Sequence, residues 1–307
     1  MQSSIPALKA SLTSDPATPA AVAALRAQPG FGATMRASAT GLVAMYEGNH
    51  LLNRLMDDRA RVLFGYLTFY LHFSRDPADP ASGLTPTRMK LMAAEHDICS
   101  AGRTTAMLSL MRLAGYLAAD ESVDRRQRRL VATDRLLDLL RARWRVHFAA
   151  MAPLFPDGEA MLAGLPDPSF TRALVIIMAE RFLAGFRFLS HAPGLGLFGE
   201  RNGGMLILAS LLIAGADDDT MPPSRPVPLS ISALARRFAV SRPHVIKMLR
   251  DAGADGSIER SGPGGESIVL SPSLAQAAQN FFATMFLFFA DSARQAMAAS
   301  ERSEGAA

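Results

Sequence analysis

The sequence predicts a mainly α-helical fold in which two small β-hairpins each follow a pair of short helices. Three observations lead to this prediction. Residues Leu229–Val240 have the spacing of a short helix, and after a tight turn Ser241–Arg260 have that of a second short helix followed by the start of a strand. A Gly-rich loop at Gly262–Ser267 and a return strand at Ile268–Ser271 come next. The same order of elements occurs about 140 residues earlier in the chain. Basic residues also recur on the second helix of each pair and on the first hairpin loop.

The composition is that of a globular protein. With 307 residues, 49% hydrophobic and 20% charged, the chain can bury one large core or two domains of about 150 residues each. The single cysteine, Cys99, cannot form an intramolecular disulfide and is typical of a reducing compartment. The chain start lacks signal-peptide features, and the longest apolar runs are about half of the roughly 20 residues that a membrane span needs. We therefore expect a cytoplasmic protein without membrane contact.

The first half divides into a flexible arm over residues 1–20 and a run of predicted elements. These elements are a helical stretch over 21–61 broken at Pro29-Gly30, a buried helix at Arg61–Phe73, helices at Leu84–Ala94 and Ser100–Ala114, strands at 116–118 and 130–133 around the charged loop Asp120–Arg129, and a helix at Asp134–Met151. Thr85 with Pro86 is a typical helix start. This order places a helix pair and a hairpin between two longer helices.

The second half repeats the first. At an offset of 141 residues Ser241 falls on Ser100 and Gly256 on Gly115, and the return strand at 268–270 falls on 130–132 after three fewer residues. A tandem duplication explains these matches, and chance similarity between two helical domains is the alternative. We expect a first repeat over 21–151, a second over 157–299 and a flexible tail over 300–307. The two repeats would then form a pseudo-dimer within one chain.

The repeated unit has the element order of a winged helix-turn-helix. In that fold the second helix enters the DNA major groove, with apolar residues on its inner face and hydrogen-bond donors on its outer face. Residues 101–150 hold ten Arg against five acidic residues, as expected where phosphates are neutralised. A solvated helix face is the alternative interpretation. The candidate DNA-binding residues on the second helices are Arg103, Thr105, Ser109 and Arg112 in the first copy, and Ser241, Arg242, His244, Lys247 and Arg250 in the second.

The first hairpin loop is the most specific single motif. The segment DRRQRRLVAT, residues 124–133, contains four arginines that we expect to contact DNA: Arg125, Arg126, Arg128 and Arg129. It resembles the wing of MarR-type bacterial regulators, with Asp124 and Arg126 at the Asp-x-Arg positions. The resemblance implies that Arg126 enters the minor groove and that Asp124 helps to hold the wing. The second helix pair is similar to GntR-type helix-turn-helices.

The sequence departs from the MarR pattern in ways that should make the two copies unequal. About four extra residues, which we place at the first turn within Glu95–Ile98, are expected to displace the helix that carries Arg103 and Thr105. The second loop, GPGGES, has Glu266 and no Arg. MarR proteins are ordinarily dimers of a single such domain, whereas this chain carries both copies. We therefore expect a nucleoid-associated transcription regulator that reads an asymmetric or imperfectly palindromic double-stranded DNA site.

Other functions have weaker support in the sequence. The six His show no metal-ligand pairing, and the Gly residues at 191–204 do not follow a strand, so we predict no enzyme, metal or cofactor. The Met- and Phe-rich helices could line an effector pocket between the copies, but core packing explains them more simply. The apolar segment Phe281–Phe289 would likewise fit either the core or a homodimer contact. The rival function is a winged-helix protein-interaction or effector-sensing module without strong DNA binding.

Overall fold

A computed structural model describes residues 15–49, 53, 59–76, 79, 82–121 and 129–304. This part of the chain is mainly helical with two small antiparallel sheets, as the sequence predicts. The first half contains α2 (Pro19–Arg26), α3 (Phe31–Tyr46), α5 (Arg59–Phe73), α6 (Pro86–Glu95), α7 (Ala101–Leu113), β1 (Leu117–Ala119), β2 (Leu130–Ala132) and α8 (Asp134–Met151). β1 and β2 form the two-stranded sheet, in which Leu117 pairs with Ala132.

The second half repeats this order with additional short helices. It contains η2 (Ala152–Leu154), α9 (Gly158–Gly164), α10 (Pro168–Leu183), η3 (Phe188–His191), η4 (Pro193–Leu195), α11 (Gly196–Gly199), α12 (Gly204–Ile213), β3 (Val227–Pro228), α13 (Ile231–Arg237), α14 (Arg242–Ala254), β4 (Ile258–Ser261), β5 (Ser267–Leu270) and α15 (Pro272–Glu304). The three-stranded sheet has the order β3-β5-β4. Ile268 of β5 faces Val227 on one side and Arg260 on the other.

Both predicted flexible ends differ from the structure where it describes them. Ala17 is buried and α2 already begins at Pro19, so the predicted arm is packed against the protein from about Asp15 onward. At the other end α15 continues to Glu304, so the first residues of the predicted tail are helical. Pro19 at the first helical position and the Thr18 side-chain cap explain the early helix start.

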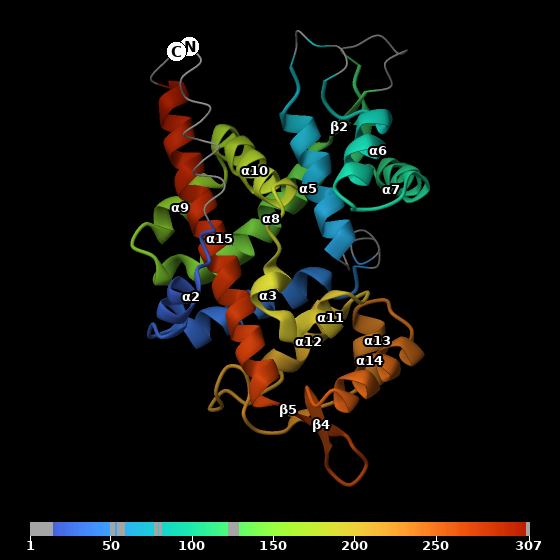
Figure 1. Cartoon of the computed structure of the whole chain (residues 1–307), viewed down its shortest axis with the longest axis vertical. Helices are drawn as coiled ribbons and strands as arrows, with labels where there is room; N and C mark the ends of the chain where they lie inside the picture. The colour runs from blue at the N-terminus through green and yellow to red at the C-terminus, as the bar shows by residue number, and fades with distance from the viewer. Residues whose placement is uncertain are drawn as a thin grey trace.

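The two halves interlock around a single core. α3 packs on α8 and also on α12 of the other half, and α10 makes the matching pair of contacts with α15 and α5. α2 packs on α15, just as α9 packs on α8. One hydrophobic cluster runs from Ala17 to Ala296. The helices α6–α7 and α13–α14 lie toward opposite ends of the same side of the molecule, away from α9 and α15 (Figure 1).

The Phe-rich part of α15 belongs to this core. Phe282, Phe286, Phe288 and Phe289 are all buried, and the Phe288 ring stacks on Phe186 with ring centroids 4.6 Å apart. Phe289 stacks on Phe148 of α8 at 5.8 Å. Large aromatic side chains contribute much of the burial energy of a core. The segment is therefore covered within the chain itself.

Candidate nucleic-acid interface

Two helix–hairpin units project from the core, and their helices begin and end in the same way. The N-terminal unit consists of α6, α7, β1 and β2, and the C-terminal unit of β3, α13, α14, β4 and β5. Ser100 and Ser241 cap the second helices, and each hydroxyl accepts the backbone N–H three residues on at 3.3 Å. Gly115 and Gly256 follow these helices with φ values of 71° and 77°. Glycine adopts this left-handed conformation without steric cost.

The turns inside the two helix pairs also match. Among the described residues, Asp97 and Ala239 are the non-glycine positions with positive φ, at 50° and 55°. Each lies in the turn of its helix pair. The residue after each one donates its N–H to a carbonyl five residues back, at 2.8 and 3.1 Å. Because non-glycine residues rarely adopt positive φ, its recurrence at matching positions supports the duplication that the sequence predicts.

The extra residues of the N-terminal unit lie mainly in α6 rather than in the turn. α6 has ten residues and α13 has seven, so α6 is longer by three residues. The turn is longer by only one residue, since Asp97 and the Ser100 cap are three positions apart and Ala239 and the Ser241 cap are two. The expectation that the extra residues all enlarge the turn is therefore wrong, since most of them lengthen α6. Arg103 and Thr105 hold positions on α7 like those of His244 and Ile246 on α14.

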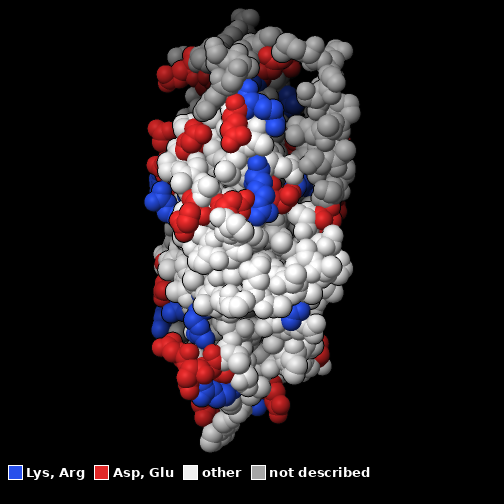
Figure 2. All heavy atoms as spheres, turned by 90° about the vertical axis from the view of Figure 1, so that its left-hand side faces the viewer, with Lys and Arg blue, Asp and Glu red and all other residues white. Residues whose placement is uncertain are grey.

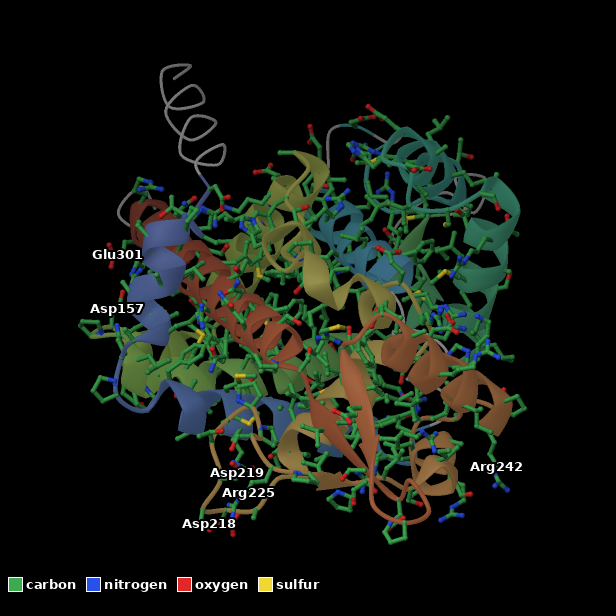
Figure 3. All side chains as sticks on the ribbon, turned by 60° about the horizontal axis from the view of Figure 1, so that its bottom comes forward. Asp157, Asp218, Asp219, Arg225, Arg242 and Glu301 are labelled. Carbon is green, nitrogen blue, oxygen red and sulfur yellow. The ribbon has the colours of Figure 1, made fainter. Side chains whose placement is uncertain are left out.

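Most predicted residues of α7 and α14 lie on the exposed faces of these helices. The exposed candidates are Arg103, Thr105, Ser109, Arg112, Ser241, Arg242, Lys247 and Arg250. The inner faces are buried through Thr104, Met107, Leu108 and Met111 of α7 and through Val245, Met248 and Leu249 of α14. Arg242 points away from the protein at the start of α14 (Figure 3). His244 is half-buried, and its Nε2 lies 2.9 Å from the Asn202 carbonyl oxygen.

The large hydrophobic side chains that are exposed in the described part of the chain belong to the helix pairs. They are Leu91 of α6, Leu113 of α7 and Ile246 of α14. Sequence reasoning did not select them, because an apolar residue in a helical pattern is assigned to the core by default. Ile246 lies beside Lys247 on α14 and is 45% exposed. A side chain of this kind can contact a thymine methyl group in the major groove.

Asp251 forms ion pairs with two cations of α14 and with Arg201. Its carboxylate accepts hydrogen bonds from Lys247 Nζ at 2.7 Å and Arg201 Nη2 at 2.6 Å, and from Arg250 Nη2 at 3.3 Å. These hydrogen bonds, that of Lys247 first, hold the pKa of Asp251 well below its usual range. Lys247 and Arg250 are therefore partly neutralised, and Arg201 ties α14 to the loop before α12. The i,i+4 spacing of Lys247 and Asp251 is a local signal for the part of this network within α14, whereas the contact with Arg201 has none, because Arg201 is 50 residues away.

The hairpins contribute differently from what the sequence predicts. Arg125, Arg126 and Arg128 lie outside the described residues. Arg129 is only 4% exposed, and its Nη1 lies 3.9 Å from the Asp120 carboxylate, which also pairs with Arg75 at 3.1 Å. Arg129 therefore faces the protein, so we exclude it from the candidate contacts. In the C-terminal hairpin the Glu266 carboxylate accepts the Gly264 N–H at 2.8 Å, inside the loop itself.

The opposite face of the molecule has no continuous basic surface in its described part. Viewed from the side of α9 and α15, basic and acidic residues are mixed toward the two ends, and a broad central band carries neither (Figure 2). On this face Arg294 of α15 is paired with Asp157 at 2.7 Å. The candidate contacts for a groove remain those predicted on α7 and α14.

A cavity of about 170 Å³ lies between the two halves. Its wall includes Tyr46, Arg143 and His147 from the first half and Phe182, Phe281 and Phe289 from the second. Arg143 donates a hydrogen bond to the Tyr46 hydroxyl and lies over the Tyr46 ring. Tyr66 also lines the cavity, and its hydroxyl accepts the Trp144 Nε1–H at 3.5 Å. Burial raises the pKa of Tyr66, so this phenol is neutral at physiological pH.

His147 at the cavity wall should make the protein less stable in mild acid. Burial, assisted by Arg143, lowers the pKa of His147 to about 3, and Ser38 Oγ lies 2.8 Å from its Nδ1. In the unfolded chain the His147 imidazole is protonated below about pH 6.5, whereas in the folded protein it stays neutral down to about pH 3. The free energy of unfolding therefore falls as the pH drops through this window. His147 should account for about 2 kcal/mol of the loss between pH 7 and 5.

Urea unfolding at pH 7 and pH 5 measures this loss. His147→Gln keeps a group that can bond Ser38 and should show a smaller loss. Burial also lowers the pKa of His72, so the free energy of unfolding of the variant should still fall from pH 7 to pH 5, but less steeply. Equal losses in wild type and His147→Gln would contradict the assignment.

The described residues contain no group of three or more His, Cys, Asp or Glu that could hold a metal ion. Within the same part of the chain no single helix is long and apolar enough to cross a membrane, although the bent pair α9 and α10 is so when the two helices are taken together. Comparisons of the chain with protein-family models, with curated proteins and with solved structures find no match.

Proposed function

We propose that this protein is a double-stranded DNA-binding transcription regulator made of two winged helix-turn-helix repeats fused into a pseudo-dimer. The observation that carries the proposal is the repeated helix–hairpin unit. Both copies have a serine cap on the second helix and a positive-φ residue in the turn before it, and both place polar and cationic side chains on the outer face of the second helix. Residues near the start of such a helix reach the base edges in the major groove. Arg103 and Arg242 occupy these positions.

The two units offer different chemistry to DNA. α7 presents two arginines with the hydroxyls of Thr105 and Ser109, whereas α14 presents Arg242, Lys247 and Arg250 beside the apolar Ile246. Arginine pairs with guanine acceptors, and an apolar side chain contacts the thymine methyl group. Two heads with different donors would read two different half-sites. This difference supports an asymmetric or imperfectly palindromic site.

A salt series of binding to genomic DNA fragments tests the proposal. Affinity should fall steeply with salt. Arg112→Ala should reduce the slope of the logarithm of the binding constant against the logarithm of the salt concentration by about one, since each phosphate contact releases about one counterion. Arg172→Ala on α10, an exposed arginine outside both units, is the control and should leave the slope unchanged. Lys247→Ala should reduce the preference among fragments; equal weakening on all fragments would mean that Lys247 contacts phosphate only. Failure to bind any fragment at low salt would overturn the proposal and favour a protein-interaction module.

A second function, the sensing of a small apolar molecule, is favoured by the cavity between the halves. A dry cavity of about 150 Å³ with an apolar lining can hold benzene, and the cavity here is of similar volume with several phenylalanines in its wall. Trp144 is the single tryptophan of the chain and hydrogen bonds to Tyr66 of the wall. Iodobenzene should therefore quench the fluorescence of Trp144 saturably. Ala209→Leu, which fills part of the cavity, should abolish this quenching, and quenching that persists in the variant would contradict binding there.

A further inference from the structure

We infer that occupancy of the cavity between the halves is transmitted to the C-terminal helix–hairpin unit through two short segments of the core. This inference rests on the proposed sensing function. Each segment contains residues of the cavity wall and also makes direct contact with α13 or α14. The first segment is residues 199–205, and the second is residues 46–48.

The first segment borders the cavity and also contacts α14. Gly199 and Met205 at its two ends line the cavity. Between them Arg201 donates to the Asp251 carboxylate in the last turn of α14, at 2.6 Å. The carbonyl oxygen of Asn202 lies 2.9 Å from His244 Nε2, near the start of the same helix. A displacement of this segment by a molecule in the cavity would therefore act on α14 at two points.

The first segment has little room to absorb such a displacement. A Cβ added at Gly199 would lie 2.5 Å from Leu189, and one at Gly204 would lie 2.0 Å from the Phe198 carbonyl oxygen. At Gly203, with φ of 67°, an added Cβ would lie 3.3 Å from Val240 in the turn between α13 and α14. Closely packed interiors transmit strain rather than absorbing it. The segment is therefore closely packed both at the cavity wall and against the helix pair.

The second segment reaches the same unit from the other half of the chain. Tyr46 lines the cavity, and the next residue, Glu47, pairs with Arg237 Nε at 3.0 Å. The Gly48 N–H donates to the Arg237 carbonyl at 3.2 Å. Arg237 is the last residue of α13. The helix pair is thus held at the end of α13, at its turn and along α14 by segments that border the cavity.

The consequence is a ligand response of the C-terminal unit. A small apolar molecule that fills the cavity would hold both segments against α13 and α14 and fix the orientation of α14. By the same linkage, a DNA site that favours this orientation would tighten ligand binding. The inferred ligand is an apolar, aromatic-sized molecule, since the described wall is dominated by Phe, Leu and Met side chains.

Hydrogen exchange without DNA tests this coupling, with iodobenzene as the probe. At about ten times its Kd the probe should increase amide protection in α14 up to about tenfold, the limit set by mass action. Protection in α7 should rise less, because global stabilisation alone would change both helices equally. The double variant Glu47→Ala with Arg201→Ala should still show Trp144 quenching but lose the difference between α14 and α7. Arg294→Ala, which breaks an ion pair on the opposite face, is the matched control.

Several outcomes would overturn the inference. Equal protection changes in α7 and α14 would show that the probe acts only through global stability. A difference that persists in the double variant would show that the ion pairs of Glu47 and Arg201 do not carry it, contrary to the inference. An absence of Trp144 quenching would show that iodobenzene does not bind in the cavity. Because no DNA is present, none of these results depends on whether the protein binds DNA.

Discussion

Replacing Asp291 with alanine is expected to lower the free energy of unfolding by about 3 kcal/mol, because it leaves a charged arginine inside the core without its partner. Arg181 of α10 is 2% exposed, and its guanidinium bonds the Asp291 carboxylate and, at 3.1 Å, the Ser292 hydroxyl of α15. It also lies 5.6 Å from the centre of the Phe288 ring. The estimate takes the low end of the range for broken buried pairs, since the Asp291 side chain is 36% exposed and water can enter.

Urea unfolding followed by circular dichroism measures this loss, and the chain offers a matched control. Asp157, just before α9, pairs with Arg294 of α15 at 2.7 and 2.8 Å, but both side chains are substantially exposed. Asp157→Ala should therefore cost no more than about 1 kcal/mol. Combining Asp291→Ala with Arg181→Met removes the stranded charge and should recover part of the loss. Equal unfolding midpoints for Asp291→Ala and Asp157→Ala would contradict the role of Arg181.

The elements that could be predicted from the sequence are those set by local interactions. Ser100 and Ser241 each cap the helix that follows them, and the apolar spacing of α8 indicates its range from Asp134 to Met151. The offset of 141 residues between the halves places α14 directly on α7. These features depend on residues within a few positions of each other. A sequence pattern can therefore identify them without knowledge of the fold.

The features that could not be predicted depend on residues far apart in the chain. Arg129 belongs to an Arg-rich loop, yet it is buried because Asp120 and Arg75 form an ion-pair cluster around it. The contact between Asp251 and Arg201 was not predicted, since Arg201 lies in a loop 50 residues before Asp251. The exchange of contacts between the halves, α3 with α12 and α10 with α5, likewise has no local signal. Long-range packing decides these positions.

Disabling one helix–hairpin unit is expected to weaken binding to a full DNA site by about 10²- to 10⁴-fold, because the proposed pseudo-dimer binds through two connected heads. The interlocked core holds α7 and α14 on one side of the molecule, so the first head to bind presents the second at a high effective concentration. The double variant Arg242→Glu with Lys247→Glu disables the C-terminal head. Arg103→Glu with Arg112→Glu disables the N-terminal head. All four side chains are exposed, so the core should remain folded.

Binding to a full site and to its two separated halves distinguishes two heads from one. Each double variant should lose most of its affinity for the full site, and each should lose binding to a different half while retaining binding to the other. The quadruple variant should keep only weak binding that disappears at moderate salt. If one double variant bound the full site as tightly as wild type, that unit would not contact DNA. The protein would then read DNA with a single head, and the second copy would serve as a structural partner that completes the shared core.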